Sequence, residues 1–338
     1  MKKLISLICV LAMVLALAAC GRSAPAAATE APAASTEAPA EDVSADKTFV
    51  VGICQLVQHP ALDAATQGFK DALTEALGDK VTFQEQNASG DSATCSLICN
   101  QFVSDEVDLI MANATASIQA AASATNTIPI LGTSITDYGV ALGVDNWTGV
   151  SGTNISGTSD LAPLDGQAAM IQELFPDAKT IGLLYCSGEP NSIFQADSME
   201  ALLTDMGYSV ERYTFADSND VSSVTANACS NADVLYIPTD NTAASCTEAI
   251  NNVALSAGIP IVAGEEGIAA GCGVATLSIS YYDLGRATGE MAAEILTEGA
   301  DVSTMEVRFA PAFTKEYNAD ICEALNITVP DDYVAIAK

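Results

Sequence analysis

The chain has 338 residues, with 12 Lys and Arg against 43 Asp and Glu, which gives a formal net charge of −31 at pH 7. A chain this acidic would repel the phosphates of nucleic acids and of anionic lipids, so composition argues against a nucleic-acid-binding protein and against electrostatic attachment to a membrane. Solubility is the simplest reason for the acidity.

The N-terminus has the pattern of a secretory signal. Lys2 and Lys3 precede an apolar run from Leu4 to Leu17, which is short for a membrane span and ends in small residues. The sequence Leu-Ala-Ala before Cys20 resembles a bacterial lipobox, in which the cysteine is lipidated and becomes the mature N-terminus. We therefore expect a lipoprotein signal peptide at 1–19 and a chain that is anchored at Cys20 outside the cytoplasm and does not cross the membrane.

Residues 20–46 are predicted to be a disordered tether. They repeat Ala, Pro, Thr and Glu and contain no large apolar residue, so they cannot bury enough surface to offset the entropy of ordering. The remaining residues, about 290, suffice for two α/β lobes with separate cores.

From Thr48 onward, short apolar runs alternate with amphipathic stretches. The first half predicts strands at 48–56, 81–88, 107–113, 128–132 and 147–154, with helices at 61–77, 91–104 and 115–125. The same alternation then repeats, with strands at 180–186, 208–215, 232–238, 259–264 and 274–280, and helices at 160–175, 191–206, 220–230, 242–257, from 265, and at 281–297. A strand near 306–311 and a helix near 315–325 close the chain.

Repeated βαβα units predict the fold class: α/β, with two doubly wound parallel-sheet lobes joined by a hinge. We place residues 47–155 and about 282–338 in the first lobe and residues 156–281 in the second. Ligands of such sheets bind beyond the carboxyl ends of the strands.

Polar residues collect at those strand ends. Helix N-termini there favour a carboxylate, while Asp137, Asp240 and Glu265 provide negative charge for an ammonium, so together they suit a small zwitterion. Each residue taken alone is explained equally well as a helix N-cap. The predicted ligand-binding residues are Gln58, His59, Thr115, Ser134, Asp137, Asn191, Ser192, Thr239, Asp240, Asn241 and Glu265.

His59 is the single histidine of the chain, and it follows the first strand. It could be a catalytic base, a metal ligand or part of a binding wall. No nucleophile elbow, P-loop or correctly placed dinucleotide fingerprint accompanies it, so we expect no enzymatic activity and no cofactor. A wall position at the cleft mouth is the preferred reading, and packing at the helix entry is the alternative.

The ten cysteines do not form a recognisable metal motif. Cys95 and Cys99 share one face of a predicted helix, but one histidine and the absence of a C-x-x-C pair argue against a metal site. We expect most cysteines to be small core residues, and the sequence does not determine whether any of them pair.

Several segments resemble a known family. From Thr48 to the C-terminus the chain is similar to the ABC-transporter substrate-binding family typified by the tryptophan-binding lipoprotein TrpX. The resemblance lies in QHPALDAATQGFKDAL, QNASGD, FVSDEVDLIMANAT, LFPDAKTIGLLY, the run from Glu189 to Asn191, YIPTDNT and ISYYDLGRATGEMA. It implies a type I periplasmic-binding fold, an aromatic amino acid such as tryptophan as ligand, and permease and ATPase subunits as partners.

Carried over by position, the resemblance places Gln58 and His59 on the first-lobe wall, with Thr115 and Ser134 nearby. Asn191, Asp240 and Asn241 would face them from the second lobe. Asp240 would hold the ligand ammonium, and Thr115, Ser134 and backbone amides the carboxylate. Residues 135–138 read Ile-Thr-Asp-Tyr where the family pattern has a turn of the Asp-Pro type.

Aromatic side chains are further candidates for contact with the ligand. Tyr138, Tyr185, Phe194 and Tyr281 are placed to stack on an aromatic ligand or to pack in the core, and Trp147 is expected to be structural. Two other functions stay open: a ligand-sensing receptor of the same fold, and a secreted α/β enzyme.

Overall fold

The computed structural model describes residues 47–337. The predicted signal peptide, the lipidation site Cys20 and the tether lie outside these residues. Within the described part of the chain, no helix is long and apolar enough to cross a membrane.

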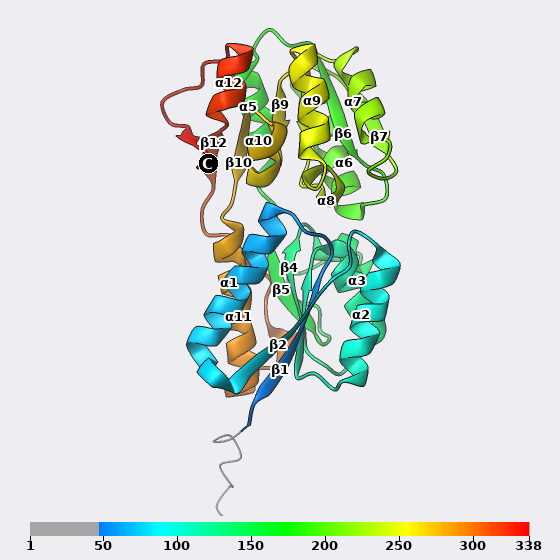
Figure 1. Ribbon diagram of the computed structural model, residues 1–338, viewed down its shortest axis with the longest axis vertical. Coiled ribbons are helices and arrows are strands. Elements are labelled where there is room, and N and C mark those ends of the chain that lie inside the picture. The colour runs from blue at the N-terminus through cyan, green and yellow to red at the C-terminus, as the bar shows by residue number, and fades with distance from the viewer. Residues whose placement is uncertain (1–46, 338) are drawn as a thin grey trace, which may run out of the picture. The chain divides into compact units, whose positions relative to one another are not determined.

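The first lobe is built on a sheet whose strand order is β11-β5-β4-β3-β1-β2, with every neighbouring pair parallel (Figure 1). Its strands alternate with helices along the chain, so each connection crosses over one face of the sheet. The strands are β1 (Phe49–Gln55), β2 (Val81–Asn87), β3 (Leu109–Asn113), β4 (Ile130–Ile135), β5 (Ile155–Ser159) and β11 (Arg308–Phe309).

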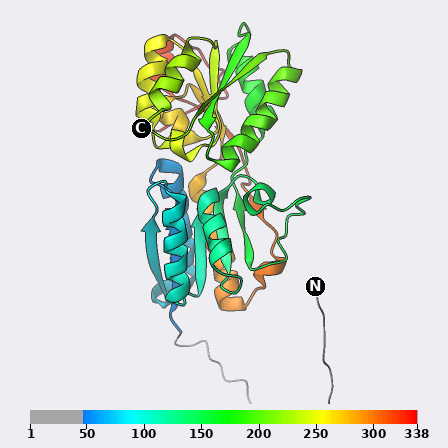
Figure 2. The ribbon, with the colours of Figure 1, turned by 90° about the vertical axis from the view of Figure 1, so that its right-hand side faces the viewer.

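Helices cover both faces of this sheet. The helices α2 and α3 pack on one face over Cys95, Phe102 and Ile118, and Figure 2 shows them in cyan in front of the strands. The helices α1 and α11 pack on the other face over Phe69 and Met291. The helical elements are α1 (Pro60–Leu77), η1 (Gly78–Lys80), α2 (Ser92–Ser104), α3 (Thr115–Ala124), α4 (Tyr138–Leu142), α11 (Tyr281–Glu298) and η2 (Val302–Thr304).

The second lobe has a sheet of order β13-β12-β10-β9-β8-β6-β7, parallel except where β12 pairs antiparallel with β10. Its strands are β6 (Thr180–Cys186), β7 (Ser209–Phe215), β8 (Val234–Ile237), β9 (Ile261–Ala263), β10 (Ala275–Ser278), β12 (Thr314–Tyr317) and β13 (Val334–Ala335). Its helices are α5 (Leu164–Leu174), α6 (Pro190–Asp205), α7 (Val221–Cys229), α8 (Asn241–Ala244), α9 (Thr247–Ala257), α10 (Glu266–Cys272) and α12 (Ala319–Leu325).

Two cores sandwich the second sheet as well. One contains Val221, Ile250 and Ile268 of α7, α9 and α10, and the other contains Met199 of α6 and Ile321 of α12. The predicted fold class, two mainly parallel α/β lobes, is confirmed.

The predicted lobe boundaries are wrong in two places. The strand β5 begins at Ile155 and lies in the first sheet, although residues from 156 onward were expected in the second lobe. The segment 314–335 was expected in the first lobe, but β12 pairs with β10 over Ala275–Ser278 and therefore extends the second sheet. An added edge strand cannot be located by periodicity alone, because its partner is distant in sequence.

Three predicted elements also differ from the structure. Residues 147–154 form a loop instead of a strand, since Gly149 and Gly152 have φ of 93° and 66°. The expected helix at 315–325 is the strand β12 followed by the shorter α12, and the expected helix at 242–257 is interrupted between α8 and α9.

Within the described residues, the chain passes between the lobes three times: after β5, after β10 and after β11. Asp160 lies on the first of these crossings, and Tyr281 begins α11 just after the second. The Tyr281 hydroxyl donates a hydrogen bond of 2.9 Å to Asp160 Oδ2. This bond links the first crossing to the start of α11.

Candidate functional site

A small enclosed cavity lies between the two lobes, at the carboxyl ends of their strands. Its volume is about 10 Å³, which is room for about one water molecule. The lobes are therefore closed on each other. The lining residues are His59, Leu62, Ser134, Thr136, Asp160, Asn191, Thr239, Asp240, Asn241, Ala244, Glu265 and Tyr281.

His59 provides the contact that bridges the lobes. The chain leaves β1 at Gln55, and Pro60 starts α1 with a backbone angle suited to a first helical turn. His59 is the residue before that helix, is 6% exposed, and its Nε2 lies 3.3 Å from Asn241 Oδ1 of the second lobe. Burial lowers the pKa of His59, while the hydrogen bond to Asn241 opposes that shift.

Glu189 accepts two hydrogen bonds from Asn241 and so fixes the position of the Asn241 side chain. Its Oε2 accepts hydrogen bonds from the Asn241 backbone N at 3.0 Å and from Asn241 Nδ2 at 2.7 Å. Its Oε1 accepts from the backbone N of Thr242 at 2.8 Å and from the Thr242 hydroxyl at 2.7 Å. Asn191 Nδ2 donates to Oε2 as well, at 3.2 Å. The carboxylate thus anchors the start of α8 and the side chain that reaches His59.

Three buried carboxyl groups line the cavity: Asp160, Asp240 and Glu265. Burial raises the pKa of Asp160 to about 6 and that of Glu265 to about 7. Burial and the nearby charge of Glu189 also raise the pKa of Asp240. No Lys or Arg is among the residues that line the cavity, so these acids face no positive charge there.

The three acids differ in how much of their hydrogen-bonding capacity is used. Asp240 accepts from Ala243 N at 2.7 Å and from Cys186 N at 2.6 Å, one on each oxygen. Glu265 caps α10 through the backbone N of Gly267 and Ile268. Asp160 uses Oδ2 for Tyr281, and its Oδ1 is buried with no partner among the described residues.

Two more buried polar atoms of cavity-lining residues lack a hydrogen-bond partner in the described part of the chain: His59 Nδ1 and Ser134 Oγ. Ser134 also has a φ of 57°, a left-handed backbone conformation that is rare for a residue other than glycine. Buried polar groups normally have partners, so such atoms at one cavity indicate where a ligand would supply them.

The structure brings together most of the predicted site residues. His59, Ser134, Asn191, Thr239, Asp240, Asn241 and Glu265 all line the cavity. Four predicted residues do not. Gln58 is exposed, Thr115 is buried at the start of α3, Asp137 caps α4 through Val140 N, and Ser192 lies behind Asn191, whose Nδ2 is 3.3 Å from its hydroxyl.

The prediction from the sequence does not include four lining residues, Leu62, Thr136, Asp160 and Ala244, and it names Tyr281 only as a candidate for stacking on the ligand. Asp160 directly follows β5, so its position at a strand end was the available signal, but that strand was predicted eight residues too early. Of the other candidate rings, Tyr138 is a core residue that stacks on Trp147 at 5.7 Å between ring centroids. Its hydroxyl donates to backbone carbonyls inside the lobe.

Eight cysteines fall in the described residues, and all are free thiols. Cys54 and Cys95 each lie 3.6 Å from the Ser117 hydroxyl, in the core of the first lobe. No group of three or more His, Cys, Asp or Glu side chains suited to a metal ion occurs in the part of the chain that the structure describes.

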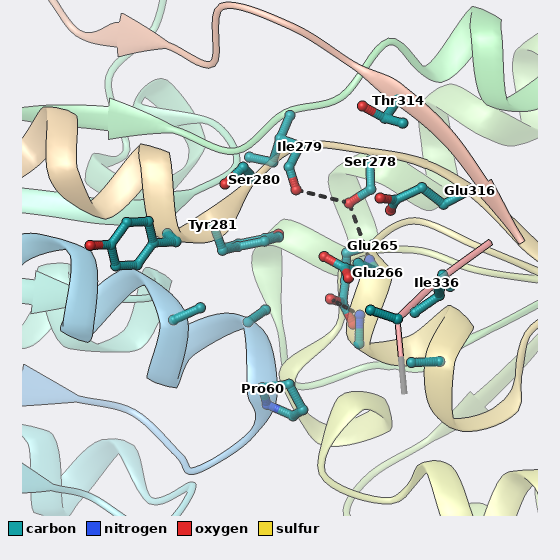
Figure 3. A pocket seen from close by; sticks show the side chains of 16 residues that line it. Pro60, Glu265, Glu266, Ser278, Ile279, Ser280, Tyr281, Thr314, Glu316 and Ile336 are labelled. Carbon is teal, nitrogen blue, oxygen red and sulfur yellow. Dashed lines mark hydrogen bonds between the residues drawn. The ribbon is translucent and has the colours of Figure 1, made fainter. Parts of the chain in front are cut away.

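A larger hollow adjoins the cavity and shares Glu265 and Tyr281 with it. Its volume is about 600 Å³. Figure 3 shows Pro60 of α1 on one side and Glu265, Glu266 and Glu316 on the other. The Ser278 hydroxyl accepts a hydrogen bond of 3.1 Å from Glu266 N in its wall.

The family model described as ABC transporter substrate binding protein matches residues 50–338. The chain belongs to this family. Like other members, this substrate-binding protein binds a small molecule outside the cytoplasm for an ABC transporter, which confirms the predicted family and general function.

Among its relatives, a tyrosine-binding protein of Clostridioides difficile (strain R20291) is 38% identical over 280 residues, which are 82% of this chain and 81% of the relative. An ABC domain from Streptococcus pneumoniae in complex with L-Trp superposes with a TM-score of 0.80 at 31% identity, over 84% of this chain and 97% of that one.

Comparison with a third relative agrees with the closed arrangement of the lobes. The ligand-free, open structure of a Clostridium difficile substrate binding protein with adhesive properties is 37% identical, over 86% of this chain and 100% of that one, yet its TM-score is 0.66. The L-Trp complex is less similar in sequence but more similar in structure. The tight cavity and the contact between His59 and Asn241 agree with closure.

Proposed function

We propose that this substrate-binding protein captures a free aromatic amino acid between its lobes and delivers it to an ABC importer. The observation that carries the proposal is the composition of the closed cavity. Three buried acids face no cation there, and three buried polar atoms of its lining residues have no partner among the described residues. A zwitterion provides both the missing cation and the missing hydrogen bonds.

The ammonium group of the ligand is assigned to Asp160, with Asp240 and Glu265 close by. Asp240 was the first choice from the sequence, but each of its oxygens already accepts a backbone hydrogen bond. Asp160 Oδ1 is free to accept, and its partner Tyr281 fixes the carboxyl group in place. An ammonium at Asp160 would also lie beside the first crossing between the lobes and the start of α11, which the bond between Tyr281 and Asp160 links.

The ligand carboxylate is assigned to the Ser134 side of the cavity. The Ser134 hydroxyl is a buried donor without a partner in the described residues, and the strained backbone at Ser134 turns the chain at the end of β4. Thr115, which the family resemblance paired with Ser134, does not line the cavity. The carboxylate role therefore falls to Ser134 and neighbouring backbone amides.

The aromatic side chain is inferred from the relatives and from the cavity walls. One relative is named for tyrosine and another was crystallised with L-Trp. In this chain Leu62, Ala244 and the ring of Tyr281 provide apolar surface beside the polar groups. We expect no catalysed reaction at this site.

Transport also requires a membrane anchor, a permease and an ATPase. We propose that the signal at 1–19 is removed, that Cys20 is lipidated, and that residues 20–46 tether the protein to the membrane. The closed protein would then dock on a permease driven by an ATPase. Metabolic labelling with a fatty-acid analogue tests the anchor: the wild type should incorporate it, and Cys20→Ala should not.

A thermal-shift screen of the full chain tests the ligand class. L-Tyrosine and L-tryptophan should raise the melting temperature, because a ligand that binds only the folded state stabilises it. Sugars and nucleosides should leave it unchanged. Stabilisation by sugars with no response to aromatic amino acids would contradict the proposal.

A further inference from the structure

Glu189 is a carboxylate near the cavity that the proposed function does not use. It lies at the start of α6 and is not among the residues that line the closed cavity. Its two oxygens accept five hydrogen bonds, two of them from Asn241. So many donors on one carboxylate exceed what a helix cap requires, so Glu189 is expected to orient its neighbours.

The first consequence concerns the amide of Asn241. An ionised carboxylate only accepts hydrogen bonds, so the atom of Asn241 that faces Glu189 at 2.7 Å is the NH₂ group. The amide oxygen then points the other way, at His59. Glu189 thereby removes the ambiguity between oxygen and nitrogen that usually attends an asparagine side chain.

The second consequence concerns the ring of His59. The Asn241 oxygen only accepts, so the His59 nitrogen 3.3 Å away, Nε2, must carry the proton. Burial lowers the pKa of His59 and keeps the ring neutral at pH 7. The other nitrogen, Nδ1, is then a bare acceptor, and it is buried with no partner among the described residues.

We propose that Glu189 and Asn241 form a relay that fixes the Nε2–H tautomer of His59, so that His59 Nδ1 accepts a hydrogen bond from the ligand. The relay selects ligands that place an N–H or O–H donor against the first-lobe wall. It rests on the proposed function in one respect, that the ligand occupies the cavity between the lobes. His59 contacts the ligand, and Glu189 acts through Asn241 as a positioning residue.

The relay also depends on closure. His59 belongs to the first lobe, whereas Asn241 and Glu189 belong to the second, so the tautomer is set only when the lobes meet. The ligand-binding form of the ring is therefore assembled by the same motion that encloses the ligand.

Nitrogen NMR of the imidazole ring tests the relay directly, because the chain contains one histidine. The full chain, prepared without a histidine tag and labelled with ¹⁵N-histidine, should show the Nε2–H tautomer at pH 8 in the presence of L-tyrosine or L-tryptophan. In Glu189→Gln the Asn241 amide can reverse, and the Nδ1–H tautomer should appear at a substantial fraction.

Two variants keep this test decisive. Glu200→Gln makes the same change on the same helix, at a residue that pairs with Arg212, and should retain the wild-type spectrum. Asn241→Ala removes the acceptor while Glu189 stays, and should also give a mixture of tautomers even if Glu189→Gln folds poorly. A Nδ1–H tautomer in the wild type, or a wild-type spectrum in both Glu189→Gln and Asn241→Ala, would overturn the relay.

Affinity measurements test the contact between His59 and the ligand. His59→Gln can still donate to Asn241 but offers no acceptor at the Nδ1 position, and it should weaken binding of the aromatic amino acid about tenfold. His59→Asn places an amide near the Nδ1 position and should recover part of the loss. If the wild type binds the ligand and His59→Gln binds it equally well, the relay fails while the proposed function stands. If the wild type binds neither amino acid, the proposed function itself fails.

Discussion

Asp160 is a buried carboxyl group with a hydrogen-bond acceptor that no described residue uses, which is rare in a protein interior. Its carboxyl is fully buried, one oxygen is bonded to Tyr281, and the other has no partner in the described residues. A buried acid in that position costs stability unless a cation or a proton joins it. A proton neutralises Asp160 below its pKa of about 6, and in the ligand-bound protein the ammonium group would take that place.

Asp160→Asn separates these two roles. The amide keeps the shape of the side chain but cannot carry the charge that attracts an ammonium, so affinity for L-tyrosine or L-tryptophan should fall 10- to 100-fold, or about 1.5–3 kcal/mol. The melting temperature of the ligand-free variant should stay at or above that of the wild type. Isothermal titration and thermal unfolding measure both; an unchanged affinity would return the ammonium to Asp240.

The pH dependence of stability follows from the same acids. The folded protein raises the pKa of Asp160 from 3.8 to about 6 and that of Glu265 from 4.5 to about 7. The folded state therefore binds more protons than the unfolded state across this range, so its free energy of unfolding falls as pH rises. The lowered pKa of His59 acts in the opposite sense, but it is one group against several.

We expect the free energy of unfolding of the closed, ligand-free form to decrease between about pH 4 and pH 7, by up to about 1.4 kcal/mol for each pKa unit of each acid, and then to level. Urea unfolding followed by circular dichroism at pH 5 and pH 8 measures the difference. Asp160→Asn should reduce it. Stability that rises steadily from pH 5 to pH 8 would contradict the raised pKa values of these buried acids.

The helices α1 and α11 pack so closely that only glycine fits at their contact points. A Cβ added at Gly285 would lie 2.0 Å from the backbone oxygen of Ala65, and one added at Gly68 would lie 2.0 Å from that of Tyr282. These distances are too short for any side chain, so the two helix backbones are in direct contact. The helix α11 carries Tyr281 at its first turn, so its position also sets one wall of the cavity.

Gly285→Ala should therefore destabilise the protein by about 2 kcal/mol or more, even though alanine favours helix by about 1 kcal/mol. It should also weaken ligand binding, because α11 must move away from α1. Chemical unfolding and titration of the ligand test both effects. Glu290→Ala, an exposed change on the same helix, should do neither; equal behaviour of the two variants would refute direct backbone contact.

Most elements were predictable because period-2 and period-3.6 patterns are local properties of the sequence. The strand β6 was predicted with its observed bounds, and α1 within one residue. The strand β12 was missed because its pairing with β10 is a long-range contact that no local pattern encodes. The start of β5 was misplaced because the apolar residues Trp147 and Val150 belong to a loop, where Trp147 packs on Tyr138.

Only part of the candidate site could be predicted from the sequence, because the site forms where the two lobes of the whole molecule meet. The rule that ligands bind at the carboxyl ends of strands located seven of the lining residues, among them His59 and Asp240. It did not separate Asp137 from them, because an N-cap and a ligand contact use the same residue types at the same positions. Thr115 also follows a strand end, but it is the first residue of α3 and is buried away from the cavity. The link from Glu189 to His59 appears only when the two lobes are brought together.

Closure is the property of the whole molecule on which ligand capture depends. The cavity of about 10 Å³ is too small to admit an amino acid from outside, so the ligand must enter an open form before the lobes close. Small-angle scattering of the full chain should show a smaller radius of gyration with L-tyrosine or L-tryptophan than without. Identical scattering in both conditions, at concentrations where titration shows saturation, would argue against closure on binding.

The measurement that tests the central claim most directly is a calorimetric titration of the full chain with an aromatic amino acid and two analogues that each lack one charged end. L-Tyrosine or L-tryptophan should bind at one site per chain. For whichever binds, the analogue without the carboxylate and the analogue without the ammonium should each bind at least tenfold more weakly, because each leaves buried polar groups of the cavity unpaired. Equal binding of all three compounds, or no binding of either amino acid, would contradict the account.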